Sequence, residues 1–285
     1  MAELASAKST AEIIKRYGFS VQKRFGQNFL IDERVLDKIV DAAAVTKDEG
    51  VIEIGPGLGT MTRRLSACAK KVVAIEIDKE LIPILSETLS SCENVKLINA
   101  DVMKTDLSAL IKEEFEDIPV KVVANLPYYI TTPIVMSLLE GRLPIKSITI
   151  MIQKEVAERM RALPGTKDYG ALSLAVGYYA DAYIAANVPQ NCFMPRPKVG
   201  SCVIRLTVRE EPFVSVSDEK QMFALIRGAF NQRRKTLVNA VSNFEGLSFK
   251  KDEVEEALKE LSLSPSIRGE ELNLRQFAAL SDILT

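Results

Sequence analysis

Five short runs of valine and isoleucine, each ending near a glycine or a polar residue, constrain the fold of this chain more than any other feature. Each run is continuous rather than alternating, which is typical of strands buried on both faces of a sheet. Their spacing of roughly 20–25 residues leaves room for a crossover helix, so the pattern predicts an α/β domain with a parallel sheet. The runs are VIEIG (51–55), KVVAIEI (71–77), VKLINA (95–100), VKVVAN (120–125) and SITIMIQ (147–153).

The pattern changes after residue 165. Two further strands, at 182–189 and 200–208, are expected to extend the sheet in antiparallel fashion, because the proline-rich segment between them is too short for a helix. A polar linker then leads to segments with helical apolar spacing. We therefore predict a larger α/β domain over residues 1–208 and a small all-helical domain over 209–285. The expected helical segments are 221–244, 252–263 and 272–284.

Composition excludes several classes of chemistry and location. The chain contains no histidine, so a histidine base, a Ser-His-Asp triad and a histidine-rich zinc site are all impossible, and we expect no metal. Its four cysteines are far apart, which indicates free thiols in a reducing compartment. The N-terminus is charged throughout, unlike a signal peptide, and the longest apolar stretch is interrupted by Asp181. We therefore expect a cytoplasmic protein with no membrane partner.

The first apolar run leads into EIGPGLG (53–59), in which closely spaced glycines precede an expected helix. Glycine lets the backbone turn tightly and lets a ligand approach the peptide groups. An ordinary strand-to-helix turn explains such a pattern as well, when it is taken alone. The chain lacks the third glycine of the dinucleotide pattern G-x-G-x-x-G, which favours S-adenosylmethionine over a dinucleotide as the cofactor.

Polar residues also end the next three runs. Glu76, with Asp78 close behind it, lies about twenty residues beyond the glycines, where an acid accepts hydrogen bonds from ribose hydroxyls. The third run ends in Asn99-Ala100-Asp101, where an amide or a carboxylate is placed to receive an adenine amino group, and Asn125 ends the fourth. Because ligands of open α/β sheets bind at the carboxyl ends of the strands, these residues are predicted to share one site.

The stretch Asn125-Leu126-Pro127-Tyr128 is unusual at the end of a buried strand. Alone, Asn-x-Pro reads as a turn. In this context it fits a site for the adenine amine, a poor nucleophile because its lone pair is delocalised into the ring. Two acceptors near the amine hydrogens would localise that pair: the Asn125 side-chain oxygen and a main-chain carbonyl, that of Leu126 by position or else that of Pro127. Tyr128 would stack on the base, worth about 1–3 kcal/mol.

The chain resembles the bacterial small-subunit ribosomal RNA adenine N6,N6-dimethyltransferases over nearly its full length. No single block is specific to that family, but the combination and order of the blocks are. The blocks are KRFGQNFLID (23–32), VIEIGPGLGTMT (51–62), INADVMK (98–104), VANLPYYITTPI (123–134), MIQKEVAERM (151–160), FMPRPKVGSCV (193–203) and FNQRRKTL (230–237).

The resemblance implies a Rossmann-like class I S-adenosylmethionine-dependent methyltransferase domain with a helical C-terminal domain. It implies that Asn28 and Leu30 close over the cofactor and that Gly55 lies against its methionine part. Phe193 would be a second aromatic wall opposite Tyr128, although an aromatic beside prolines is also compatible with a packed loop. The cofactor-binding residues that it implies are Asn28, Leu30, Gly55, Glu76, Asp101 and Asn125.

The resemblance also implies a reaction and a partner. The reaction is methylation of N6 in two adjacent adenosines of a 3′-terminal hairpin loop of 16S rRNA, which gives N6,N6-dimethyladenosines. The expected partner is therefore 16S rRNA in the assembling small ribosomal subunit, with a role in ribosome biogenesis. We expect the protein to act as a monomer.

Contacts with RNA must come from local basic clusters, because the net charge is −1. A solvated surface explains each cluster equally well. The run 233–235 is favoured, since it is expected on a helical stretch beside Asn231 and Gln232. The slightly acidic total indicates recognition by shape within the ribosome. The candidate RNA-binding residues are Lys23, Arg24, Arg159, Arg161, Arg196, Lys198, Arg233, Arg234 and Lys235.

Three other functions stay open at this point. A large-subunit adenine dimethyltransferase that confers macrolide resistance shares the cofactor half and an Asn-x-Pro-aromatic motif. A ribosome-assembly factor could keep the fold with little need for catalysis. The intact set of Gly55, Glu76, Asp101 and Asn125 argues against a dead enzyme. DNA adenine and protein glutamine methyltransferases usually carry N-P-P-Y or D-P-P-Y, whereas this chain has Leu126 in the second position.

Overall fold

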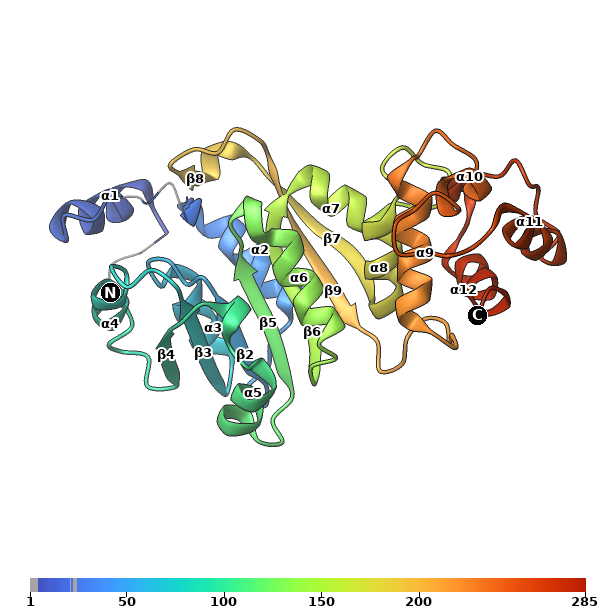
Figure 1. Cartoon of the computed structure of the whole chain (residues 1–285). Coiled ribbons are helices and arrows are strands. Elements are labelled where there is room, and N and C mark those ends of the chain that lie inside the picture. The colour runs from blue at the N-terminus through green and yellow to red at the C-terminus, as the bar shows by residue number, and fades with distance from the viewer. Residues whose placement is uncertain (1–4, 21, 23–24) are drawn as a thin grey trace. The chain divides into compact units, whose positions relative to one another are not determined.

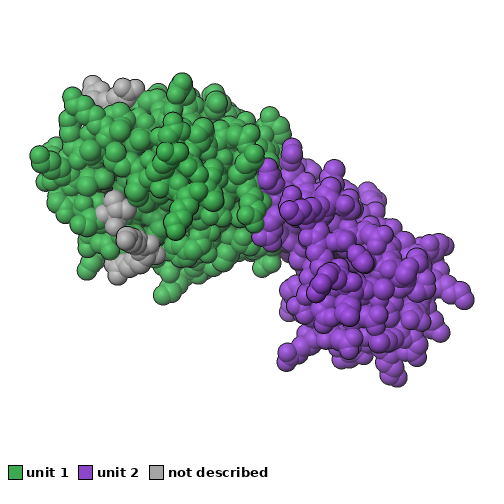
Figure 2. Space-filling model, turned by 90° about the horizontal axis from the view of Figure 1, so that it is seen from above, with its two compact units in different colours: residues 1–157, 182–208 green, residues 158–181, 209–285 purple. Residues whose placement is uncertain are grey.

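The computed structural model describes residues 5–20, 22 and 25–285, and the chain forms two compact units (Figure 2). Unit 1 comprises residues 1–157 and 182–208, and unit 2 comprises residues 158–181 and 209–285. Residues 158–181 thus pack with the C-terminal helices. The division at residue 208 into a methyltransferase domain and a helical C-terminal domain remains a prediction.

A seven-stranded sheet forms the centre of unit 1, in the order β4-β3-β2-β5-β6-β9-β7 (Figure 1). The pairs from β4 to β6 are parallel and β9 runs antiparallel to β6, so the predicted Rossmann-like arrangement with an antiparallel extension is confirmed. The strands are β2 (Gly50–Ile54), β3 (Lys71–Glu76), β4 (Val95–Asn99), β5 (Val120–Asn125), β6 (Ile145–Gln153), β7 (Ala180–Val188) and β9 (Ser201–Val208).

Helices cover this sheet and bury its continuous apolar runs. Helix α2 packs against β6 and β9, and α3 packs against β3. One core cluster joins Leu36 and Ile39 of α2 to Val51, Val123 and Met151 of the strands, all with at most 1% of their surface exposed. The helices are α1 (Ala7–Arg16), α2 (Glu33–Ala43), α3 (Thr60–Cys68), α4 (Ile82–Thr88), α5 (Leu107–Phe115) and α6 (Thr131–Glu140), with α7 (Lys154–Arg161) crossing the boundary at residue 157.

A second, two-stranded sheet joins segments that are distant in the sequence. Strand β1 (Phe29–Leu30) pairs antiparallel with β8 (Phe193–Met194), so that Leu30 lies opposite Phe193. The main-chain N–H of Ile31 continues this pairing by donating to the carbonyl of Cys192 at 2.8 Å. The pairing attaches the N-terminal segment to the rim of the main sheet, where the site described below lies.

Unit 2 is helical, as the sequence predicts for its C-terminal part. The prediction of one helical segment over 221–244 is wrong, because α9 ends at Asn231 and α10 begins after Thr236. The Thr236 hydroxyl accepts a hydrogen bond from the N–H of Asn239 and so starts a new helix, while the apolar periodicity continues across the break. The helices are α8 (Ala171–Tyr179), α9 (Glu219–Asn231), α10 (Leu237–Val241), α11 (Lys251–Glu260) and α12 (Leu274–Ile283).

None of the helices in the described part of the chain combines the length and apolar character that crossing a membrane requires.

Candidate active site

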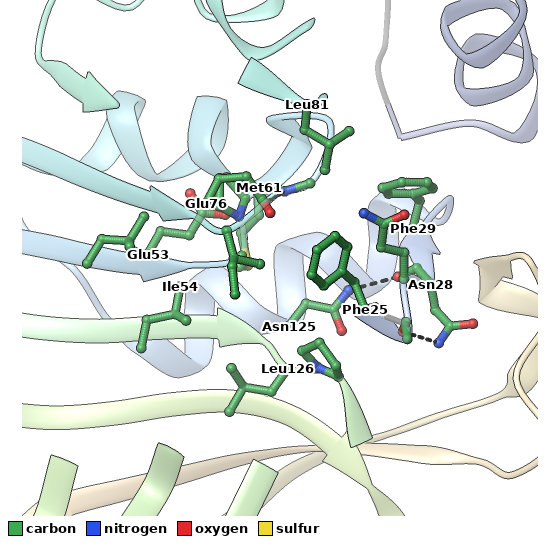
Figure 3. Close-up of a pocket in the computed structure, with 18 of the residues that line it drawn as sticks. Phe25, Asn28, Phe29, Glu53, Ile54, Met61, Glu76, Leu81, Asn125 and Leu126 are labelled. Atoms are coloured by element: carbon green, nitrogen blue, oxygen red, sulfur yellow. Dashed lines mark hydrogen bonds between the residues drawn. The ribbon is translucent and has the colours of Figure 1, made fainter. Parts of the chain in front are cut away.

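A pocket opens at the carboxyl ends of the parallel strands in unit 1, with the segment 25–30 along its rim (Figure 3). The strand ends supply polar atoms, and apolar side chains such as Met61, Leu81 and Ile134 supply the walls. The structure therefore brings together the residues that the sequence distributes over four strand ends. Of the residues predicted from the sequence, those lining the pocket are Asn28, Leu30, Gly55, Glu76, Asp101, Asn125, Leu126, Pro127, Tyr128 and Phe193.

The glycine turn after β2 forms one wall of the pocket. Gly55 and Gly57 have φ values of 71° and 60°, a left-handed conformation that favours glycine. A Cβ atom at Gly57 would lie 3.3 Å from the ring of Phe29, whereas one at Gly55 would meet only the carbonyl oxygen of Asn125, at 4.0 Å. Gly55 thus leaves open space in front of its peptide, which a ligand can approach closely.

Glu76 presents a buried carboxylate at the end of β3, with 4% of its surface exposed. One oxygen accepts a hydrogen bond from the N–H of Asp78 at 2.8 Å, and the other accepts from the N–H of Gly57 at 3.3 Å. Burial raises the pKa of this carboxyl to about 7, against the lowering effect of these two N–H groups. The main chain thus orients the carboxylate and leaves acceptor lone pairs for ligand hydroxyls.

Asp101 lies at the start of the short 3-10 helix that follows β4. Its carboxylate accepts a hydrogen bond from the N–H of Met103 at 3.0 Å, which fixes the side chain at the pocket edge. Ile77, with 48% of its surface exposed, lines the same side of the pocket. An acceptor beside an apolar surface suits an adenine ring with its amino group.

Glu53 is a second buried carboxyl beside the pocket, and the sequence pattern did not single out its side chain. It lies on β2 with 0% exposure, and neither oxygen makes a hydrogen bond of ordinary geometry with the described residues. Burial raises its pKa to about 8; Thr62 opposes the shift and the nearby charge of Glu76 adds to it. Glu53 is therefore largely protonated at neutral pH.

Glu53 should make the stability of the protein depend on pH. Because its folded-state pKa lies above its ordinary value of 4.5, the folded state binds the proton more tightly, and stability falls as pH rises toward 8. Between pH 6 and pH 9 this group should lower the free energy of unfolding by about 3 kcal/mol. The side chain of Glu53→Gln stays neutral at both pH values. In urea unfolding, the free energy of unfolding of this variant should therefore fall by about 3 kcal/mol less between pH 6 and pH 9 than that of the wild type.

Glu255→Gln is the matched control for this experiment, because Glu255 is exposed on α11. Its unfolding curves should track those of the wild type at both pH values. Parallel pH profiles of Glu53→Gln and the wild type would show that Glu53 is already ionised in the folded protein at pH 6.

Asn125 is oriented by the N-terminal segment. Its side-chain NH₂ donates to the carbonyl oxygen of Asn28 at 3.1 Å, and the NH₂ of Asn28 in turn donates to the carbonyl of Gly26 at 3.0 Å (Figure 3). With its NH₂ group engaged, Asn125 has its side-chain oxygen available as an acceptor in the pocket. The sequence could not reveal this contact, since any residue at position 28 offers the same carbonyl.

The two main-chain carbonyls that follow Asn125 differ in their availability. The Pro127 carbonyl accepts hydrogen bonds from the N–H of Ile130 at 3.2 Å and from the Thr131 hydroxyl at 3.1 Å. The Leu126 carbonyl accepts none from the described residues, while its own N–H donates to Met151 at 3.3 Å. The carbonyl of Leu126 is therefore the one that is free for a ligand.

Two aromatic residues predicted from the sequence, Tyr128 and Phe193, line the pocket. The Tyr128 hydroxyl shares a hydrogen bond of 2.7 Å with the hydroxyl of Ser201, which fixes the direction of the ring. Partial burial raises the pKa of Tyr128, so the hydroxyl stays neutral. Phe193 lines the pocket from β8 and has only 4% of its surface exposed. No pattern in the sequence links Ser201 to Tyr128.

Gln27 is a further residue that sequence reasoning missed. Its side-chain NH₂ donates to the carboxylate of Asp78 at 2.7 Å, and its oxygen accepts from the N–H of Gln22 at 2.9 Å. These bonds attach the N-terminal segment to the loop after β3. The sequence offered one indication of this role, since Gln27 lies in the block 23–32 and precedes Asn28.

None of the predicted basic residues in the described part of the chain is among those that line the pocket. Arg196 and Lys198 are exposed in the loop between β8 and β9, and Arg159 and Arg161 are exposed on α7. The run 233–235 follows α9 rather than lying on a helix, which corrects that expectation. Lys23 and Arg24 lie outside the described residues.

Arg233 already has partners inside unit 2. Its guanidinium forms an ion pair with Glu270 at 2.6 Å and donates to the carbonyl of Thr166 at 3.2 Å. Arg234 and Lys235 are exposed beside it. Within that run, a structural role thus explains Arg233, and the two following cations are the better candidates for phosphate contacts.

The pocket suits S-adenosylmethionine. The glycine turn gives backbone access, Glu76 offers an acceptor for ribose hydroxyls, and Asp101 with Ile77 offers an edge for adenine. The described residues contain no cluster of cysteine, aspartate or glutamate that could hold a metal ion. The donor set therefore fits an organic cofactor with a ribose.

Comparison with known proteins agrees with this geometry. The family model described as ribosomal RNA adenine dimethylase matches residues 18–282. "Ribosomal RNA small subunit methyltransferase A" of Lachnoclostridium phytofermentans is 58% identical over 100% of this chain and 98% of its own length. The protein of the same name from Geobacillus thermodenitrificans is 52% identical, over 99% of this chain and 97% of its own.

Solved structures give the same result. A dimethyladenosine transferase from Plasmodium falciparum superposes with a TM-score of 0.74 at 28% identity, covering 88% of this chain and 95% of its own. The 23S rRNA methyltransferase ErmE superposes with a TM-score of 0.68 at 27% identity, covering 90% of this chain and 99% of its own. The fold is thus shared with solved structures described as a dimethyladenosine transferase and a 23S rRNA methyltransferase.

Proposed function

Because this chain belongs to the ribosomal RNA adenine dimethylase family, we propose that it methylates N6 of two adjacent adenosines in a 3′-terminal hairpin loop of 16S rRNA, giving N6,N6-dimethyladenosines. It is an S-adenosylmethionine-dependent rRNA adenine dimethyltransferase, as its relatives over the full chain length are. The choice of the small subunit rests on the names of those relatives. The choice of N6 rests on the acceptors at the end of β5.

The observation that carries the proposal is the pair of unoccupied acceptors beside the glycine turn. The Asn28 carbonyl holds the NH₂ of Asn125, so the Asn125 oxygen is free to accept one amine hydrogen. The Leu126 carbonyl is free to accept the other, since the Pro127 carbonyl is already doubly engaged. Two acceptors at the amine localise its lone pair on nitrogen and stabilise the positive charge that develops there.

The remaining groups position the base. Tyr128, directed by Ser201, would stack on the extruded adenine, with Phe193 as the opposite wall. S-adenosylmethionine supplies an electrophilic methyl group on a sulfonium, and transfer of that group forms the N–C bond as the S–C bond breaks. The amine proton becomes acidic at that stage, so a chain without histidine can complete the reaction. Catalysis is then mainly positioning and electrostatics.

Glu76 and Asp101 would hold the cofactor at its ribose and adenine, and Gly55 would lie against its methionine part. Asn28 and Leu30 would close over it from the segment that β1 and β8 attach to the sheet. The exposed cations Arg159, Arg161, Arg196, Lys198, Arg234 and Lys235 would contact phosphates, as would Lys23, Arg24 and, to a smaller degree, the paired Arg233.

The test is methyl transfer from radiolabelled S-adenosylmethionine to purified small subunits that lack the modification. We expect incorporation into the 3′-terminal hairpin, and mass analysis of the digested rRNA should find dimethyladenosine at two neighbouring positions. Subunits that already carry the modification are the matched control and should accept no label. No label in the unmodified small subunits, or label only outside the 3′-terminal hairpin, would overturn the assignment.

The large-subunit branch is the second candidate, because ErmE shares the fold over 90% of this chain. Macrolide resistance distinguishes the two branches. Expression of this chain in a macrolide-sensitive host should leave sensitivity unchanged, and acquired resistance would reverse the choice between the two branches.

The setting of the reaction follows from the substrate. We expect the protein to act in the cytoplasm on the assembling small subunit, as a monomer, and to bind the rRNA by its shape because the net charge is only −1. Sedimentation of the purified protein, alone and with subunits, tests both the monomer and the complex.

A further inference from the structure

A second tyrosine stands next to the proposed stacking residue and has no role in the reaction as described so far. Tyr129 follows Tyr128 in the 3-10 helix η3 (Tyr128–Ile130) and lines the same pocket. It has 62% of its surface exposed. Burial of a large aromatic surface is strongly favourable, so an exposed ring at the mouth of a pocket is available for a ligand.

The Tyr129 ring has a fixed support. A Cβ atom built at Gly26 would lie 3.4 and 3.5 Å from two ring carbons of Tyr129, and 3.3 Å from Cβ of Pro127. Gly26 has a φ of 59°, so a side chain there would be strained as well as crowded. The ring therefore rests against the N-terminal segment, whose next residues contact Asn125 and Asp78.

The Tyr129 hydroxyl makes no hydrogen bond with the described residues, unlike that of Tyr128. Nothing in the described part of the chain therefore requires a phenol at this position. What the position offers is a supported aromatic surface, one residue along the chain from the ring that would stack on the target base. Among the exposed large apolar side chains of the described residues, only Ile77 and Tyr129 line the pocket, and Ile77 lies beside the proposed adenine acceptor Asp101.

We propose that Tyr129 stacks on the nucleotide next to the adenosine in the pocket, so that two neighbouring bases engage two neighbouring tyrosines. The inference rests on the proposed function, since it needs a substrate whose target base has a base beside it. The neighbour of an extruded base loses a stacking partner, and an aromatic side chain can replace that partner. Tyr129 would thus be a positioning residue that holds the second adenosine while the first one reacts.

The test combines variants of the protein with variants of the RNA. Small subunits are reconstituted with 16S rRNA whose 3′ segment is added by ligation, either unmodified or with an abasic nucleotide in place of one adenosine of the pair. The protein variants are Tyr129→Phe, which keeps the ring, and Tyr129→Leu and Tyr129→Ala, which remove it. Initial rates of methyl transfer to the remaining adenosine give kcat and KM for each combination.

On unmodified RNA we expect kcat/KM of Tyr129→Ala and Tyr129→Leu to fall about 5- to 150-fold, mainly through KM, and that of Tyr129→Phe to stay within about 2-fold of the wild type. On RNA with the abasic nucleotide, the wild type should fall to the level of the two variants, and the variants should lose nothing more. Tyr183→Ala is the matched control, because Tyr183 is a 65% exposed tyrosine of unit 1 that does not line the pocket.

Two results would overturn the inference. One is an equal loss for Tyr129→Ala on abasic and unmodified RNA, which would mean that the ring supports the pocket wall or the N-terminal segment. The other is no loss on unmodified RNA for Tyr129→Ala or Tyr129→Leu. Binding of S-adenosylmethionine to each variant checks that the cofactor site is intact. Failure of the wild type to methylate unmodified subunits would instead refute the proposed function.

Discussion

Replacing Asn125 with alanine is expected to lower kcat for methyl transfer to small subunits by about 100- to 1,000-fold, while subunit binding stays near the wild-type level. Losing one preorganised group that stabilises developing charge costs this much in other enzymes. Asn125 contributes one of the two acceptors proposed for the amine, and the Leu126 carbonyl cannot replace it. The Asn28 carbonyl also loses its donor, so the rim of the pocket loosens.

Single-turnover methylation measures this effect without interference from product release. Asn243→Ala is the matched control, because Asn243 is an exposed asparagine of unit 2 whose side chain donates to the carbonyl of Asn239. Asn125→Asp keeps an acceptor but cannot donate to Asn28, so its rate should fall between those of the wild type and Asn125→Ala. A near-normal rate for Asn125→Ala would exclude this side chain from the reaction.

Replacing Glu76 with alanine is expected to weaken S-adenosylmethionine binding by about 100-fold or more. Two charge-assisted hydrogen bonds to ribose hydroxyls would be lost, each worth about 1.5–3 kcal/mol. The N–H groups of Gly57 and Asp78 would also lose the acceptor that now organises the glycine turn. Isothermal titration with S-adenosylmethionine measures the change directly.

The same residue predicts a pH dependence of cofactor binding. Burial places the pKa of Glu76 at about 7, so the carboxyl is increasingly protonated below that pH and loses acceptor capacity. Cofactor affinity of the wild type should therefore fall as pH drops from 8 to 6, by at most about tenfold per pH unit below the pKa. Glu76→Gln should bind weakly at both pH values, with a flat profile.

Glu80→Gln is the control for the loss of a negative charge. Glu80 is an exposed acid in the loop after β3, and it does not line the pocket. Its cofactor affinity should follow that of the wild type. If Glu76→Ala binds S-adenosylmethionine as tightly as the wild type does, the ribose lies elsewhere and the proposed orientation of the cofactor is wrong.

Glu76→Ala also separates catalysis from a role in assembly. In a host without the wild-type gene, an inactive protein that restores small-subunit assembly would show that binding is sufficient. If assembly fails equally with the inactive protein and with no protein, methylation itself is required. Urea unfolding of the variant must first show that it is folded, because weak cofactor binding is expected of an inactive protein and of a misfolded one alike.

Much of the sheet could be predicted because its cause is local in the sequence. Strands β2, β3 and β5 are continuous runs of valine and isoleucine, and such runs are stable only when both faces are covered. The break between α9 and α10 was not predictable from apolar periodicity, since Leu237 and Val241 continue the spacing of the preceding helix. The Thr236 cap starts the new helix there, and apolar periodicity contains no information about capping residues.

The polar ends of the strands could be placed together for the same reason. Gly55, Glu76 and Asn125 each end or follow a parallel strand, and parallel strands share one carboxyl edge. Glu53 shows the limit of this reasoning, because its burial depends on how α3 and the neighbouring strands close around it, leaving it no hydrogen bond of ordinary geometry with the described residues. Its raised pKa is a property of that enclosure and not of the pattern EIGPG (53–57).

The sequence by itself thus determined the parallel sheet, the edge on which the pocket lies and the types of polar group that line it, because residue type and spacing are enough to fix these. The tertiary structure alone decided which groups are free to act. It tied the Asn125 amide to Asn28, occupied the Pro127 carbonyl with Ile130 and Thr131, and paired β1 with β8 across the pocket rim. These contacts use main-chain atoms that every residue possesses, so only the path of the folded chain selects them.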